Sequence, residues 1–361
     1  MKKILALDGR TGGGALLRSA LALSASLGVP FRVQRFRAGE QKPGLLREHL
    51  AAIRAFSSLC GGKAEGAVMG SEEFLFEPGE IHPKSLRVAL GVAGSAAELL
   101  QSLVLPLARG TSGTSVALSV TGATYSPGSV PGEFLTLTLG PALQKAGWPV
   151  AFEQVRRGFP APGAGEVRAR VSGNFSPEPL ELVRRGEIVS VRARVVLKGL
   201  DPGIADREAR VVSELLGPSF GVDESSVIRD RASGSEGVGN AVVIEAETET
   251  GTAVFSSAGT VRTSAESVAE AAAREALRFL HGMVPVTPGL AERLLVPLAL
   301  GAGGVFRTTR PTARTRAAAD VIRLFTGNAV GMEKDADGAW TVRVNGVRSG
   351  PEEEKTTNWK E

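Results

Sequence analysis

Residues 4–36 read ILALDGRTGGGALLRSALALSASLGVPFRVQRF and contain the first strand–helix–strand pattern of the chain. The short apolar runs at 4–7 and 31–36 predict two strands, and the longer apolar pattern at 15–27 predicts a helix between them. Because short strands and helices alternate along much of the remaining sequence, we expect an α/β fold.

The order of these predicted elements recurs. The first set continues with a helix at 44–59 and strand-like stretches near residue 67 and at 73–76. The second set has, in order, a strand at 86–90, a helix at 96–107, a strand at 115–120, a helix at 133–146 and strands at 150–154 and 167–171. A third set is split, and its closing elements are a strand at 305–309, a helix at 317–325 and a strand at 340–344. The sequence therefore predicts three repeats of a βαβαββ unit.

A stretch with a different order interrupts the third set. It has a strand at 188–197, a helix at 204–216 and strands at 241–247 and 252–256. We interpret residues 182–275 as an inserted smaller α/β domain. Residues 1–181 and 276–345 then form the large domain with the three repeats, and the polar residues 346–361 are expected to be a flexible tail.

Composition narrows the class of protein. The chain of 361 residues is 43% hydrophobic and 22% charged, which excludes wholesale disorder. Its single cysteine, Cys60, excludes an internal disulfide and a thiolate metal site. Asp8 and Arg10 interrupt the first apolar run too early for a signal peptide, and no uncharged stretch reaches membrane-spanning length, so we expect a cytoplasmic protein. A net charge of +4 is compatible with a phosphate-rich partner.

Arg18 lies inside the first predicted helix, which is apolar on nearly all sides. A guanidinium seldom stays buried without an anionic partner, and the glycine run one turn earlier marks a helix start, where anions bind well. Two readings remain open: an anion-binding site, or a structural ion pair with a carboxylate such as Asp8 or Glu48.

Residues 37–50, RAGEQKPGLLREHL, form a second candidate site. Arg37 and Lys42 flank a turn, and His49 follows on the next helix. A single histidine on a helix is more often packed or capping than catalytic, but the two basic neighbours favour a position that faces an anion.

Several segments in this order resemble RNA 3'-terminal phosphate cyclases. They are LDG at 7–9, LLRSAL at 16–21, the segment at 37–50, GVAGSAAELLQSLVLPLA at 91–108, RRGFPAPGAGEV at 156–167 and GLAERLLVPLALGAGG at 289–304. The resemblance extends from about residue 4 to residue 344. It implies three repeats of the initiation-factor-3 C-terminal type with an inserted small domain.

The resemblance also implies a reaction. Enzymes of this family are ATP-dependent ligases that use ATP and Mg²⁺ to adenylylate a histidine. They pass AMP to an RNA 3'-phosphate, and the adjacent 2'-hydroxyl then closes a 2',3'-cyclic phosphate. ATP, Mg²⁺ and an RNA 3' end are therefore the expected cofactors and partner.

The resemblance assigns roles to individual residues. Those expected to hold the RNA terminal phosphate or the triphosphate are Arg18, Arg37, Lys42 and His49. Those expected around the nucleotide are Gly13, Gly14, Gln101, Pro131 and Glu292.

Four departures from the family pattern bear on chemistry. The loop DGRTGGGALLR at 8–18 is about two residues shorter and lacks the family's metal-binding glutamate, so no metal ligand is assigned. Ala164 interrupts a glycine triplet, and Glu40 stands where a basic residue is common. Most important, Arg314 falls where the nucleophilic histidine is expected.

Arginine cannot serve as that nucleophile, because a guanidinium stays protonated and exposes no lone pair near neutral pH. The three histidines, His49, His82 and His281, all lie outside the segment that contains Arg314. Arg310, Arg314 and Arg316 can instead bind phosphate through paired N–H groups.

Three hypotheses follow. The chain is an RNA-end enzyme that works through a rearranged site or through His49, or it is a non-catalytic RNA-binding relative, or it is an enolpyruvyl transferase with the same repeat architecture. Residues 37–50 fit the cyclases better than the transferases. We favour impaired or absent cyclase chemistry and predict salt-dependent RNA binding.

Overall fold

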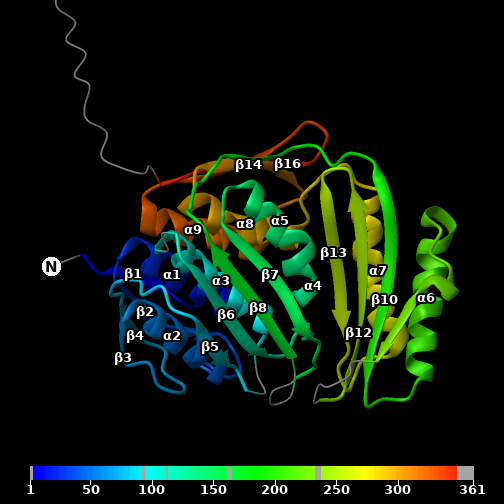
Figure 1. Cartoon of the computed structure of the whole chain (residues 1–361), viewed down its shortest axis with the longest axis horizontal. Helices are drawn as coiled ribbons and strands as arrows, with labels where there is room; N and C mark the ends of the chain where they lie inside the picture. Colours follow the sequence, from blue (N-terminus) through cyan, green and yellow to red (C-terminus); the bar gives the residue numbers. More distant parts are fainter. Residues whose placement is uncertain (1–2, 92–93, 111–112, 161–164, 232–236, 348–361) are drawn as a thin grey trace, which may run out of the picture.

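The computed structural model describes residues 3–91, 94–110, 113–160, 165–231 and 237–347. These residues form four mixed four-stranded sheets and the helices that pack on them (Figure 1), so the α/β prediction is confirmed. Ala164 and residues 348–361 of the expected tail lie outside the described residues.

The first sheet follows the predicted strand–helix order closely. Its elements are β1 (Leu5–Asp8), α1 (Gly13–Leu27), β2 (Phe31–Gln34), α2 (Arg47–Cys60), β3 (Lys63–Glu65) and β4 (Phe74–Glu77). The strand order is β1-β2-β4-β3, with β1 parallel to β2 and β4 antiparallel to both of its neighbours. The strand expected near residue 67 ends at Glu65, because Gly66 takes the left-handed conformation and turns the chain.

The second sheet repeats this order. Its elements are β5 (Leu86–Ala89), α3 (Ala96–Gly110), β6 (Ser115–Gly122), α4 (Gly132–Phe134), a π-helical turn (Leu135–Leu139), α5 (Gly140–Lys145), β7 (Val150–Arg156) and β8 (Gly165–Ser172). The strand order is β5-β6-β8-β7, with the same parallel and antiparallel pairs as in the first sheet.

The third sheet joins segments that are far apart in the chain. Its elements are β9 (Leu180–Leu182), α8 (Pro288–Leu300), β14 (Gly303–Thr308), α9 (Ala313–Thr326), β15 (Val330–Lys334) and β16 (Trp340–Asn345). The strand order, read from β9, is β9-β14-β16-β15, and β9 is parallel to β14. All three sheets therefore share one order of parallel and antiparallel pairs.

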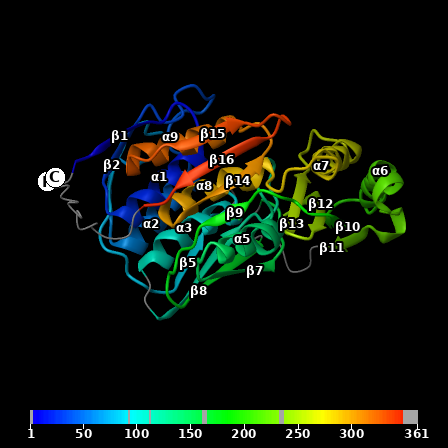
Figure 2. The ribbon, with the colours of Figure 1, turned by 90° about the horizontal axis from the view of Figure 1, so that it is seen from above.

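The segment between β9 and α8 forms the fourth sheet. Its elements are β10 (Ile188–Lys198), α6 (Gly203–Phe220), a 3₁₀ turn (Glu224–Ser226), β11 (Ile228–Arg231), β12 (Gly239–Thr248), β13 (Gly251–Ala258) and α7 (Ala265–Leu280). Figures 1 and 2 show α6 and α7 together at one end of the molecule, against this sheet. They share a separate apolar core with it. The predicted domain limits stay a prediction, and α7 continues through residue 275 without a break.

Helix α1 lies at the centre of the large core. It packs against α2, α3, α8 and α9, so it contacts helices that belong to all three repeating sheets. Leu17, Leu21 and Leu23 are fully buried there. This packing explains why α1 is apolar on nearly all sides, and it brings charged residues of α1, α3 and α8 together.

Within the described residues, no helix is at once long enough and apolar enough to cross a lipid bilayer.

Candidate functional site

Three helices meet at a buried carboxylate. Glu98 of α3 pairs with Arg18 of α1, at 3.1 Å from Oε2 to Nη2, and its Oε1 accepts a hydrogen bond from Nη2 of Arg293 on α8. The Glu98 and Arg293 side chains are only 9% and 8% exposed. These three residues, here called the buried triad, join the three repeating units at one point.

The Glu98 carboxylate is saturated by hydrogen bonds. Gln101 Nε2 donates to Oε2 at 2.8 Å, and the Val130 N–H donates to Oε1 at 3.4 Å. Burial alone would raise the pKa of Glu98, but the guanidiniums of Arg293 and Arg18 outweigh it and lower the pKa to about 2. The carboxylate is therefore ionised at neutral pH, and the triad has one positive charge more than it has negative charges.

A cleft opens beside the triad at the start of α1. Its lining includes Gly13, Gly14, Arg18, Arg37, Glu98, His49, Glu292, Arg293 and Arg314. A Cβ atom on Gly14 would lie 3.1 Å from Arg18 Nη1 and 3.2 Å from His49 Nε2. Two nitrogen atoms thus converge on a space that glycine leaves open at a helix N-terminus.

His49 is held in one orientation by its neighbours. Its Nδ1 accepts the Leu46 N–H at 3.0 Å, and its ring packs edge-on against Phe36. Burial, together with the charges of Arg37 and Arg18, lowers the pKa of His49 to about 4. The ring is therefore neutral near pH 7. Because Nδ1 accepts a hydrogen bond, the proton lies on Nε2 and points to the cleft.

The turn before α2 supplies another arginine to the cleft. Arg37 donates from Nη1 to the Gly44 carbonyl at 3.1 Å. Its φ is +55°, a left-handed conformation that costs a non-glycine residue on the order of 1 kcal/mol or more. The buried ring of Phe36 anchors this turn.

Arg314 approaches the cleft from the first turn of α9. Thr312 caps this helix by accepting the Thr315 N–H at 3.1 Å. The Arg314 side chain is exposed and borders the cleft and two adjoining cavities. Glu292, on the opposite helix α8, lines the same three spaces, and burial raises its pKa.

The structure brings together most residues that were singled out from sequence. Seven of them line the cleft: Gly13, Gly14, Arg18, Arg37, His49, Glu292 and Arg314. Gln101 and Pro131 line one adjoining cavity each. Lys42, Arg310 and Arg316 are exposed and do not belong to the lining of the cleft, so their phosphate-binding role stays a prediction.

Arg18 does form a structural ion pair, which was one of its two open readings, but not with Asp8 or Glu48, the carboxylates given as examples. Arg18 pairs with Glu98, whereas Asp8 pairs with Arg10 and Arg35 on the surface. Sequence reasoning missed Glu98 and Arg293. Each is a charged residue inside an otherwise apolar helix, and opposite charges in two such helices are the signal that could have paired them.

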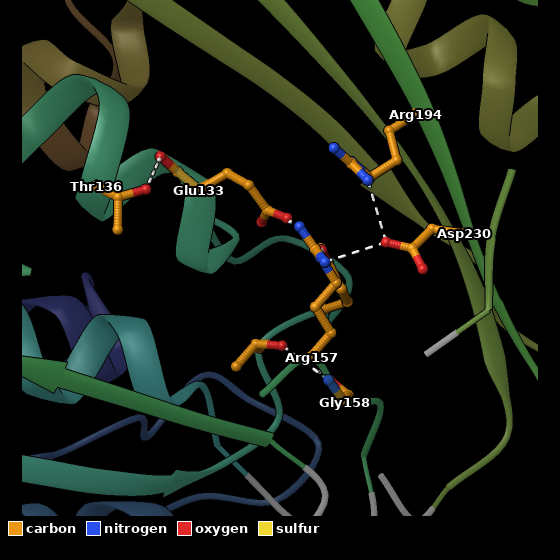
Figure 3. A network of polar contacts seen from close by, with 8 residues as sticks. Glu133, Thr136, Arg157, Gly158, Arg194 and Asp230 are labelled. Carbon is orange, nitrogen blue, oxygen red and sulfur yellow. Dashed lines mark hydrogen bonds and ion pairs between the residues drawn. The ribbon is translucent and has the colours of Figure 1, made fainter. Parts of the chain in front are cut away.

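A second polar network holds the inserted segment against the second unit (Figure 3). Arg157 donates from Nε to Glu133 Oε1 and to the Tyr125 hydroxyl, both at 3.0 Å. Its Nη1 lies 3.0 Å from Asp230 Oδ2, which also pairs with Arg194 of β10 at 3.1 Å. Because Tyr125 and Glu133 bracket residues 126–131, this network anchors both ends of a loop that lines the cleft.

The match to known families covers this whole arrangement. Residues 10–332 match the family model described as RNA 3'-terminal phosphate cyclase. This chain belongs to the RNA 3'-terminal phosphate cyclase family. The matched residues include every helix that contributes to the cleft, from α1 to α9, and also the inserted segment. It favours the cyclase family over the enolpyruvyl transferases.

We expect Glu98→Gln to destabilise the protein by about 3–5 kcal/mol, because Arg18 and Arg293 would stay buried without a carboxylate. Denaturant unfolding measures this change. Glu270→Gln, which breaks the exposed pair with Arg274 on α7, is the matched control and should cost less than about 0.5 kcal/mol. Equal effects of the two substitutions would contradict the role of the triad.

The Glu98 contribution should also depend on pH. Its folded pKa of about 2 lies below the ordinary glutamate value of 4.5, so its stabilisation is complete above pH 4.5 and is lost as pH falls toward 2. The difference in the free energy of unfolding between wild type and Glu98→Gln should therefore become smaller as pH falls from 4.5 toward 2.

We expect NMR to show that His49 stays neutral down to about pH 4, because burial and two arginines oppose its protonation. The unfolded state takes up this proton near pH 6.5, so stability should fall as pH drops from 6.5 toward 4. His49→Gln should remove that part of the pH dependence and identifies the resonance among three histidines. Titration of His49 near pH 6.5 would show that its ring is not buried as described.

Proposed function

We propose that this chain binds the 3'-terminal phosphate of RNA in the cleft at the start of α1. The observation that carries the proposal is the convergence of Arg18 Nη1 and His49 Nε2 on the open space at Gly14. Membership of the cyclase family supports an RNA 3' end as the ligand.

The chemistry of the lining suits a phosphate. The N-terminus of a helix offers backbone N–H groups to an anion, and a guanidinium can donate two parallel hydrogen bonds to phosphate oxygens. Neutral His49 adds a third type of donor through Nε2–H. Arg37 and Arg314 supply further positive charge from two other walls.

ATP binding is proposed for the adjoining cavities. Gln101 Oε1 is buried and has no hydrogen-bond partner among the described residues, so it can accept a hydrogen bond from a nucleotide. Pro131, Phe255 and Glu292 line the neighbouring pocket. When bound, ATP would supply the nucleotidyl group of the family reaction.

The described residues do not fit a Mg²⁺ ion held by the protein. They contain no group of three or more His, Cys, Asp or Glu side chains that could hold a metal. Four carboxylates line the cleft, those of Glu40, Glu48, Glu98 and Glu292. Glu98 is committed to Arg18 and Arg293, and no three of the four form such a group.

We propose that phosphate binding occurs without a covalent nucleotidyl intermediate. A nucleophile needs an exposed lone pair, and Arg314 offers none. His49 is a poor substitute, because its Nδ1 lone pair accepts the Leu46 N–H and its Nε2 carries the proton. Both side chains thus donate hydrogen bonds to an anion. The alternative is retained ATP-dependent formation of a 2',3'-cyclic phosphate, which the family match supports.

We expect the protein to bind a six-nucleotide oligoadenylate with a 3'-phosphate more tightly than the same oligomer with a 3'-hydroxyl, as measured by fluorescence anisotropy. Arg314→Gln should weaken phosphate-dependent binding about tenfold, because it removes one charge-assisted contact. The slope of log affinity against log salt should become shallower by about 0.7.

Arg323→Gln is the matched control for this measurement. It removes an exposed arginine from the same helix, which pairs with Asp320 and lies outside the cleft lining, and should change affinity less than about twofold. Equal binding of the two oligomers, or equal losses in the two variants, would overturn the proposed site.

We expect no acid-labile labelled band on a denaturing gel after incubation with Mg²⁺ and ATP labelled at the α-phosphate. Arg314→His should recover little labelling, because the shortened glycine loop lacks its carboxylate. A band that survives Arg314→Ala would reveal a nucleophile elsewhere. Cyclised RNA ends formed by the unmodified protein would establish the alternative function.

A further inference from the structure

Two arginines of one turn adopt an unusual backbone conformation. Among the described residues, Arg35 and Arg37, with φ of +56° and +55°, are the ones other than glycine that have a positive φ. Such strain persists only where surrounding contacts fix the backbone, and it gathers at functional sites. Arg37 lines the cleft, whereas Arg35 does not.

Tertiary contacts hold this turn in place. The Phe36 N–H donates to the Glu72 carbonyl and the Arg37 N–H to the Gly9 carbonyl, both at 2.9 Å. A Cβ atom on Gly9 would lie 2.8 Å from the Phe36 Cα, so the end of β1 and the turn are packed backbone to backbone. The positions of Arg35 and Arg37 are therefore set before any ligand arrives.

Two segments that line the cleft are each preceded by an arginine of one surface cluster. Arg10 precedes the glycines at the start of α1, and Arg35 precedes Arg37. Asp8 joins the two, since its Oδ2 lies 2.8 Å from Nη2 of Arg10 and 2.8 Å from Nη2 of Arg35. Two guanidiniums share one carboxylate, which leaves a surplus of positive charge.

The two guanidiniums of this cluster remain accessible. The Arg10 and Arg35 side chains are 59% and 57% exposed. Arg35 uses Nη2 for Asp8, while a guanidinium has five N–H donors. The Cα atoms of Arg35 and Arg37 are at most about 7 Å apart, because only one residue separates them. Along the backbone, the cluster is therefore separated by a single residue from an arginine that lines the cleft.

We propose that Arg10 and Arg35 form a second phosphate subsite, which binds the internucleotide phosphate next to the RNA 3' end. This inference rests on the proposed binding of the terminal phosphate in the cleft. The substrate class is then an RNA of at least two nucleotides with a 3'-phosphate. A mononucleotide fills only the inner position.

The test compares two ligands by calorimetry: adenosine 3'-monophosphate and the dinucleotide ApAp, which adds one adenosine and one internal phosphate. The wild-type protein should bind ApAp at least about fivefold more tightly. Arg35→Gly and Arg10→Gln should each reduce this ratio of affinities to below about twofold, without weakening the binding of adenosine 3'-monophosphate.

Arg35→Gly is chosen because glycine accepts a positive φ without strain, so its melting temperature should stay within about 2 °C of wild type. Arg274→Gln, which removes an exposed and paired arginine from α7, is the control and should leave the ratio unchanged.

Each outcome discriminates. If the ApAp preference persists in both Arg35→Gly and Arg10→Gln, or is missing from wild type that still binds adenosine 3'-monophosphate, the second subsite is wrong and the inner site stands. If wild type binds neither ligand, the proposed function fails and the subsite with it.

Discussion

The buried triad is the constraint on which the rest of the structure depends. Glu98 is taken out of water, and such a carboxylate is tolerable only with close cationic partners and full hydrogen bonding. Its two partners come from α1 and α8, so the ion pairs fix how three helices from three separate sheets meet. Any rearrangement of these helices would leave at least one charge in the apolar core without its ion-pair partner. The geometry of the cleft is thus tied to the integrity of the whole large core.

The same triad sets the electrostatics of the cleft. Two guanidiniums against one carboxylate leave a net positive charge at the start of α1, which favours anions. Glu40, Glu48 and Glu292 also line the cleft, and burial raises the pKa of Glu292. Burial, Arg37 and the triad's Arg18 together oppose protonation of His49. A side chain that would ordinarily titrate near neutrality is instead kept as a constant hydrogen-bond donor. The site therefore favours recognition of phosphate over proton transfer by His49.

Sequence reasoning succeeded where local patterns decide the outcome. The α/β class follows from alternating short strands and helices, and the cleft residues of 37–50 lie on a turn and helix that short-range pattern defines. It failed for Glu98, because pairing a charge on α3 with α1 and α8 requires knowledge of how helices pack. The family resemblance singled out Arg314, but the residue pattern alone grouped it with Arg310 and Arg316 for phosphate binding, since the exact start of α9 decides which side chain faces the cleft. The left-handed backbone at Arg35 and Arg37 was also hidden, because tertiary contacts impose a conformation that glycine usually adopts.

The pairing of β9 with β14 has a consequence for biosynthesis. Leu180 pairs with Gly304, so about 120 residues leave the ribosome between these two partners. The first two sheets and the inserted segment, which has its own core, can fold during that interval. The backbone of β9 stays without its partner strand until β14 emerges. The flank of α1 that packs on α8 and α9 is also uncovered until those helices emerge. A nascent chain that stalls before Pro288 therefore presents an apolar helix flank and a free strand edge, which are the features that chaperones bind.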